Sequence, residues 1–146
     1  MSYTTSSHAT YDCRYHIVWI TKYRKKCLSD ELQSTIKQVI EWVCKELYIT
    51  IIAMGMEEDH VHLYLRTPLN KPIPYIVKAL KWRTSRVVWK DNNHRNYLKP
   101  YYWTTGSALW AVWYFVSTVG VVDAEVIKNY VELQWKEETE GLEIEL

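Results

Sequence analysis

Cysteine is scarce, and the few that are present argue against a disulfide framework. The chain contains only Cys13, Cys27 and Cys44. This is an odd number, and the spacing does not match a metal-binding motif. We therefore do not expect a secreted scaffold held by disulfides. We expect a protein of the reducing cytoplasm.

Long apolar runs are also missing. The first residues, MSYTTSSHAT, contain no apolar stretch of the kind that a signal peptide needs. No segment approaches the roughly 20 apolar residues of a membrane span, so no membrane association is expected. The sequence also lacks repeats, linkers and low-complexity segments. We therefore expect residues 1–146 to form a single domain, with 1–10 as a flexible lead and 139–146 as an acidic tail.

The net charge of +1 by itself argues for no class of partner, but the charges are unevenly distributed. Residues 14–26 and 78–99 are strongly basic, whereas the chain from Glu132 onward is acidic. The basic stretches could face a polyanion while the tail stays away from it. Solubility explains the same charges equally well. The candidates for nucleic-acid contact are Arg14, Lys22, Arg24, Lys25, Lys26, Lys78, Lys81, Arg83 and Arg86.

Phenylalanine is almost absent, whereas other aromatic residues are abundant. The chain has one Phe, eight Trp and twelve Tyr. Buried Tyr and Trp need a hydrogen-bond partner for their polar group, and exposed ones can stack on bases or on a partner protein. This composition is compatible with nucleic-acid binding but does not require it.

Periodicity in the first half of the chain predicts a strand, a helix and a hairpin. Residues 11–23 alternate as a strand does. Ser29 is a helix N-cap candidate, and apolar residues follow at helical spacing over 30–47. Residues 48–56 and 60–67 read as two strands joined by a polar turn.

The second half predicts another helix from Pro72 to Lys90, a loop over 91–107 and a strand over 109–120. A last helix is expected from Asp123 to Glu138. The order β-α-β-β-α-β-α favours an α+β domain. We expect a ferredoxin-like split β-α-β fold with a mostly antiparallel sheet, helices on one face and an additional C-terminal helix.

The segment His60-Val61-His62 places two of the five histidines one residue apart. Side chains at positions i and i+2 of a strand point the same way. The two imidazoles could therefore bind one cation, and Mg²⁺ or Mn²⁺ is possible if oxygen ligands complete the shell. A structural or surface pair remains the alternative interpretation.

Tyr130 and Gln134 are four residues apart on the expected last helix, so they share a face. A Gln carbonyl oxygen suits Mg²⁺ or Mn²⁺. A Tyr phenolate beside such a cation can attack phosphorus. The competing interpretation is packing, because Val126, Tyr130 and Leu133 also form a helical stripe.

Five segments in order resemble the single-tyrosine HUH transposases of IS200/IS605-type insertion sequences, which are TnpA-like proteins. They are TKYRKK, DHVHLYL, LKWRTSR, LWAVWYFVSTVG and IKNYVELQ. The resemblance covers about residues 11–136. It implies that His60 and His62 bind Mg²⁺ or Mn²⁺, that Gln134 completes the metal shell, and that Tyr130 is the catalytic nucleophile on the last helix.

The resemblance also implies a reaction and partners. The family cleaves and rejoins single-stranded DNA with hairpin ends through a 5′-phosphotyrosine and a free 3′-OH. Its members are homodimers whose sheets join. The turn before the histidines departs from the family's usual Met-Pro-acid pattern, because Glu57 and Glu58 follow Met56.

Three other functions compete with this interpretation. A domesticated relative that processes hairpin repeats would retain the same residues. A non-catalytic ferredoxin-like nucleic-acid-binding module would need neither metal nor Tyr130. A histidine-triad nucleotide hydrolase would need a third histidine where Tyr64 stands, which argues strongly against it.

Overall fold

The computed structural model describes residues 3–102 and 108–118. The expected last helix, with Tyr130 and Gln134, and the acidic tail lie outside these residues. No helix in the described ranges has the length and apolar character of a membrane span.

Four strands of the described residues form one antiparallel sheet in the order β4-β5-β3-β6. They are β3 (Arg14–Thr21), β4 (Thr50–Met56), β5 (His60–Arg66) and β6 (Trp110–Thr118). Because β5 lies between β3 and β4, the first βαβ unit is split, as in a ferredoxin-like fold. The predicted α+β class and sheet type are confirmed.

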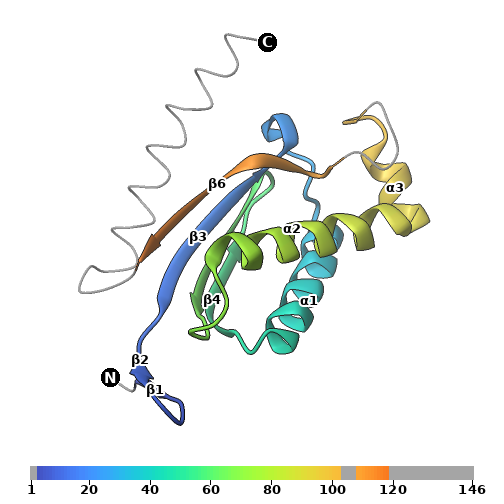
Figure 1. Cartoon of the computed structure of the whole chain (residues 1–146). Coiled ribbons are helices and arrows are strands. Elements are labelled where there is room, and N and C mark those ends of the chain that lie inside the picture. The colour runs from blue at the N-terminus through green and yellow to red at the C-terminus, as the bar shows by residue number, and fades with distance from the viewer. Residues whose placement is uncertain (1–2, 103–107, 119–146) are drawn as a thin grey trace.

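Two long helices lie on the same side of this sheet (Figure 1). The first, α1 (Asp30–Glu46), begins after Ser29, whose Oγ accepts a hydrogen bond from the Leu32 amide at 3.3 Å. The second, α2 (Ile73–Lys90), follows Pro72. Both helices begin and end within about one residue of the predicted positions.

Two segments differ from the prediction. The segment predicted as a loop contains α3 (Asn92–Leu98). The Asp91 side chain caps it by accepting hydrogen bonds from Asn93 N at 2.9 Å and His94 N at 3.0 Å. Leu98 is fully buried at its other end. The prediction missed this helix because its Asn-rich sequence has low helix propensity, which capping and burial outweigh.

The N-terminal lead also contains regular structure. Strand β1 (Thr4–Thr5) pairs with β2 (Thr10–Tyr11) in a small antiparallel hairpin. A single turn of 3₁₀ helix, η1 (Lys22–Arg24), follows β3. Part of the segment expected to be a flexible lead is thus hydrogen-bonded.

The core lies on the helix-covered face of the sheet, so the strand residues that do not enter the core point to the opposite face. On β5, Val61, Leu63 and Leu65 are fully buried in this core. Side chains alternate along a strand, so His60 and His62 project from the opposite face, which we call the second face. Val61 therefore points away from the two histidines.

Leu63 directly follows His62 on β5, and its side chain is fully buried in the core. We expect Leu63→Ala to lower the free energy of unfolding by about 2–5 kcal/mol, because it leaves a cavity. Leu69 is 60% exposed, so Leu69→Ala should change stability by no more than about 0.5 kcal/mol. Chemical denaturation measures both. Equal losses of stability in the two variants would contradict the burial of Leu63 in the core.

Candidate metal centre

His60 and His62 lie side by side on the second face of β5. Their ring centroids are 5.6 Å apart and the ring planes are 29° from parallel. His60 is opposite Ile20 of β3, and His62 is opposite Val18 of β3 and Gly55 of β4. The prediction that the two imidazoles share a face is confirmed.

His60 is oriented by the residue that precedes it. Its Nδ1 lies 2.9 Å from Asp59 Oδ1, and Asp59 Oδ2 accepts a hydrogen bond from Arg24 Nε at 3.1 Å. Burial raises the pKa of Asp59, but the hydrogen bond with His60 and the charges of His60 and Arg24 outweigh this effect. The net pKa is lowered, so Asp59 is a carboxylate. Because Nδ1 of His60 contacts Asp59, a metal ion would bind His60 through Nε2.

The turn after β3 brings Arg24 to Asp59. Tyr23 and Arg24 have φ values of 58° and 52°, in the left-handed region that non-glycine residues seldom adopt. The Thr21 amide donates to the Asp59 carbonyl at 2.9 Å, which ties the end of β3 to the start of β5. One of the predicted DNA contacts, Arg24, is thus engaged at the histidine site.

The His62 ring has different neighbours. It lies against Gly55 on β4, and its centroid is 6.2 Å from that of His16 on β3. His16 is buried, with 5% of its surface exposed. Sequence reasoning missed Gly55 as a neighbour of the site. A lone glycine within a strand pattern signals such close approach.

The two imidazoles fit a metal ion but do not complete a site by themselves. They are adjacent, share one face and include one ring held by a carboxylate, as metal-binding histidines commonly are. Within residues 3–102 and 108–118, no group of three or more His, Cys, Asp or Glu could hold a metal ion. A metal ion bound by the two imidazoles would need further ligands from outside the described residues or from a bound molecule. Oxygen ligands would favour Mg²⁺ or Mn²⁺.

Tyr64, two residues after His62, belongs to a separate polar cluster on the same face. Its hydroxyl accepts a hydrogen bond from Arg14 Nη1 at 3.0 Å, and Arg14 Nε donates to Asp12 at 2.8 Å. Arg14 is another predicted DNA contact, and its guanidinium is held on the sheet by these two partners.

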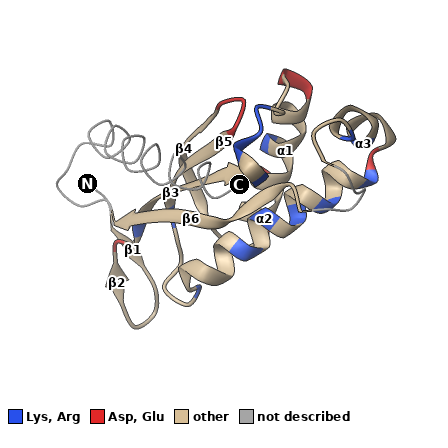
Figure 2. Cartoon of the chain, turned by 90° about the horizontal axis from the view of Figure 1, so that it is seen from above, with Lys and Arg blue, Asp and Glu red and all other residues tan. Residues whose placement is uncertain are grey.

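The remaining predicted DNA contacts divide into groups. Lys and Arg residues lie along α2 and in the segment after β3 (Figure 2). The segment after β3 carries Lys22, Lys25 and Lys26, and Lys22 Nζ is 5.3 Å from the Tyr23 ring centroid. Arg83 of α2 pairs with Glu46 at 2.6 Å and stacks on Trp42, with 4.7 Å from its Cζ to the ring centroid.

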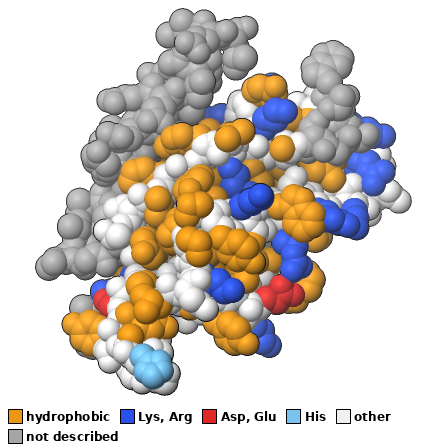
Figure 3. All heavy atoms as spheres, in the orientation of Figure 1, with side chains coloured by type: hydrophobic (Ala, Val, Ile, Leu, Met, Phe, Trp, Pro, Cys, Tyr) orange, Lys and Arg blue, Asp and Glu red, His pale blue; other side chains and the backbone are white. Residues whose placement is uncertain are grey.

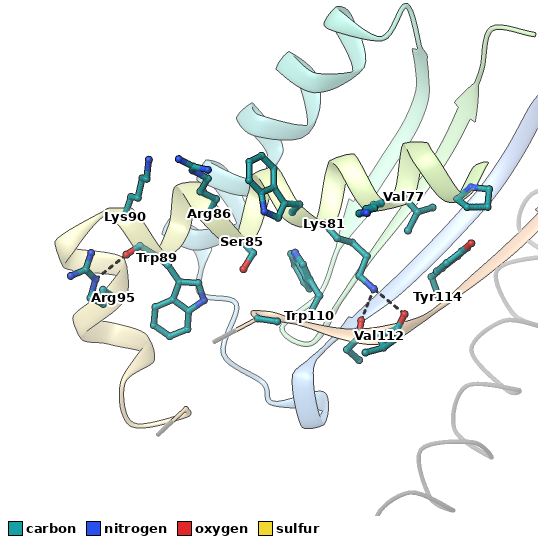
Figure 4. A pocket seen from close by; sticks show the side chains of 15 residues that line it. Val77, Lys81, Ser85, Arg86, Trp89, Lys90, Arg95, Trp110, Val112 and Tyr114 are labelled. Atoms are coloured by element: carbon teal, nitrogen blue, oxygen red, sulfur yellow. Dashed lines mark hydrogen bonds between the residues drawn. The ribbon is translucent and has the colours of Figure 1, made fainter. Parts of the chain in front are cut away.

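The other three predicted DNA contacts on α2, Lys78, Lys81 and Arg86, line a groove of about 930 Å³ between α2 and β6. Figure 4 shows Lys81 pointing across this groove to β6, where its Nζ donates to the Ala111 and Val112 carbonyls. Burial lowers the pKa of Lys81. Its role in the described residues is to hold α2 to β6.

The groove is mainly apolar and aromatic. Trp82, Trp89, Trp110 and Tyr114 line it, and none of its lining residues in the described chain is acidic. On the face shown in Figure 3, hydrophobic side chains lie between Lys and Arg side chains. The groove is therefore suited to an apolar partner with a neutral or negative rim.

Comparison with known proteins shows which family this chain resembles. The family model described as "Transposase IS200 like" matches residues 9–134. The ISDra2 transposase TnpA of Deinococcus radiodurans is 31% identical over 128 residues, which are 88% of each chain. The IS200 transposase of Salmonella typhimurium is 24% identical over 142 residues, which are 96% of this chain and 88% of that protein.

Solved structures of transposases also resemble this chain. A crystal structure of a candidate transposase from Deinococcus radiodurans R1 superposes with a TM-score of 0.73 at 31% identity, over 90% of this chain and 97% of that one. A REP-associated tyrosine transposase bound to a REP hairpin superposes with a TM-score of 0.56 at 11% identity, over 87% and 68% of the two chains. The latter likeness shows the fold alone. By its matched length and its relatives, this chain belongs to the family of IS200-like transposases.

Proposed function

We propose that this transposase cleaves and rejoins single-stranded DNA at insertion-sequence ends through a 5′-phosphotyrosine intermediate on Tyr130. The proposal rests chiefly on the adjacent His60 and His62 rings, with His60 held by Asp59, in a chain of this family. His60, His62 and Gln134 would hold Mg²⁺ or Mn²⁺. Tyr130 and Gln134 lie outside the described residues, so their roles rest on the sequence.

The bond changes balance without an external energy source. The Tyr130 phenolate oxygen attacks the phosphorus, a P–O(Tyr) bond forms, and the bond from phosphorus to the 3′ oxygen breaks. That 3′ oxygen takes a proton and leaves as a 3′-OH. A 3′-OH then attacks the phosphotyrosine, gives up its proton and releases the tyrosine. The tyrosyl ester conserves the phosphodiester's energy between the two steps.

The residues on β5 and β3 prepare the site for this chemistry. When bound, the cation would polarise the scissile phosphate and stabilise its developing charge. Asp59, which accepts a hydrogen bond from Arg24, contacts Nδ1 of the His60 ring, and this would leave Nε2 for the cation. The buried strand β5 keeps both rings on one face.

DNA with hairpin ends is the proposed substrate. A REP hairpin is bound to one structural neighbour, and relatives are transposases of insertion sequences. Lys22, Lys25 and Lys26 follow β3 directly, close in sequence to Arg24 at the histidine site, and are the favoured phosphate contacts.

The three free cysteine thiols, two of them buried, suit a reducing cytoplasm.

A second copy of this chain is the proposed occupant of the β6 edge and its groove. Within the described residues β6 is the last strand of the sheet, and strands at an edge offer backbone groups for pairing. Val112 on this strand is 97% exposed, beside an apolar groove lined by Trp82 and Tyr114. Pairing of two such edges would cover this surface and produce a homodimer with a joined sheet.

Val112→Lys should weaken the dimer, because it places a charge at the proposed contact. Sedimentation velocity across a concentration series should show at least about a tenfold weaker self-association, which corresponds to about 1.4 kcal/mol. Ile52→Lys, on the opposite edge strand β4, is the control and should leave self-association unchanged. Equal behaviour of both variants and the parent would contradict a β6 dimer.

Tyr130→Phe should abolish the covalent protein–DNA adduct, because phenylalanine lacks the attacking oxygen. The assay uses labelled single-stranded DNA spanning the ends of the chain's own gene, with Mg²⁺ or EDTA, on a denaturing gel. Tyr48→Phe is the matched control, since Tyr48 is 84% exposed, and it should form the adduct normally. Hairpin binding by the parent protein with no adduct in any metal would instead support a non-catalytic DNA-binding module.

Asp59→Asn should reduce Mn²⁺ affinity by about 10–100-fold, because an amide orients the His60 ring less well and removes a negative charge behind it. Isothermal titration calorimetry measures the affinity. Glu58→Gln removes one charge from the adjacent exposed residue and should change affinity less than about threefold, since exposed charges are screened. Similar losses in the two variants would indicate that general charge, and not orientation of His60, controls binding.

A further inference from the structure

Gly55 occupies a position where no side chain fits beneath the His62 ring. It is the cross-strand partner of His62, on β4. A Cβ added at Gly55 would lie 2.4 Å from both Cε1 and Nε2 of His62 and 3.2 Å from its Nδ1. Contacts of 2.4 Å are far inside van der Waals separation, so any other residue requires the imidazole to move.

The backbone gives no other reason for glycine here. Gly55 lies within β4 and does not have the positive φ that would exclude L residues. Glycine inside a strand weakens the strand, because it has no side chain to pack and more freedom to lose. The glycine therefore opposes local stability, and the space it leaves is filled by the His62 ring.

We propose that Gly55 is a positioning residue for His62: its missing side chain lets the imidazole lie against the β4 backbone and sets where Nε2 points. Nε2 is one of the two ring atoms that a Cβ would strike. The rings of His60, at 5.6 Å, and His16, at 6.2 Å, stand on other sides of His62. The inference rests on the proposed function, in which His62 binds the divalent cation.

Within the described residues, the contacts around the two histidines differ in kind. Polar contacts hold His60 from behind, through Asp59 and Arg24. At His62, the missing side chain of Gly55 adds a steric constraint from the neighbouring strand. A substitution at Gly55 should therefore disturb His62 and leave the Asp59–His60 contact in place.

Gly55→Ala tests the proposal. The atoms it would strike belong to the outer part of a side chain, so the ring can turn aside and the fold should survive. Without metal, the ¹⁵N and ¹³C resonances of the His62 imidazole should shift, and those of His60 should shift much less. Mn²⁺ affinity by calorimetry should fall by at least about tenfold.

Ala53→Val is the matched control. Ala53 is exposed and lies two residues earlier on the same face of β4, opposite Tyr64. It adds bulk to the same strand without meeting His62. We expect parental imidazole resonances and parental Mn²⁺ affinity. A loss of affinity equal to that of Gly55→Ala would assign the effect to β4 in general and overturn the proposal.

A double-mutant cycle with His62→Ala covers the case in which Gly55→Ala folds poorly. If the imidazole is the reason for the glycine, any loss of thermal stability caused by Gly55→Ala should disappear when the ring is absent. The added methyl should then be neutral or stabilising. The same loss in both backgrounds would overturn the proposal.

These measurements separate the inference from the proposed function. If His62→Ala binds Mn²⁺ as tightly as the parent, the metal role fails, whereas the resonance shifts and the cycle still test Gly55. If His62→Ala loses Mn²⁺ while Gly55→Ala retains both affinity and resonances, the positioning role fails and the metal role stands.

Discussion

The alternation of side chains along β5 is the constraint on which the candidate site depends. Val61, Leu63 and Leu65 are fully buried beneath α1 and α2. Their burial fixes the register of the strand, since a slip of one residue would place apolar residues on the second face and histidines in the core. The free energy that stabilises the core thereby also keeps His60 and His62 together.

Electrostatic contacts then connect this strand to the turn that follows β3. Arg24, Asp59 and His60 form a continuous chain of polar contacts at 3.1 Å and 2.9 Å. Each group is at least partly shielded from water, which makes such contacts stronger than on an open surface. The basic turn is therefore a candidate DNA contact that also reaches the candidate metal centre. Arg24 makes this connection through its contact with Asp59.

Sequence periodicity predicted much of the fold because the core elements are strongly patterned. The alternation of β5 and the Ser29 cap of α1 are local signals, and the structure confirms both. The capped helix α3 was missed, since a helix of this length depends on Asp91 and the burial of Leu98 more than on propensity. The shared face of His60 and His62 was predictable from their spacing. The contacts of Arg24 with Asp59 and of Gly55 with His62 were not, because residues far apart in sequence make them.

Several of the cations predicted to contact DNA also make contacts within the protein. Arg14, Arg24 and Arg83 each form an ion pair with a carboxylate, and Lys81 donates to β6 carbonyls. Sequence reasoning counts such residues as surface charge, whereas their contacts give them roles in holding elements together. The contacts of all nine with DNA stay predictions.

The central claim is that His60 and His62 together bind one divalent cation. A crystal structure with Mn²⁺, read from its anomalous signal, tests this most directly. The account predicts one Mn²⁺ within bonding distance of Nε2 of both His60 and His62, with the Asp59 contact to Nδ1 of His60 retained. Mn²⁺ bound elsewhere at saturating concentration, with the two imidazoles unligated, would contradict it.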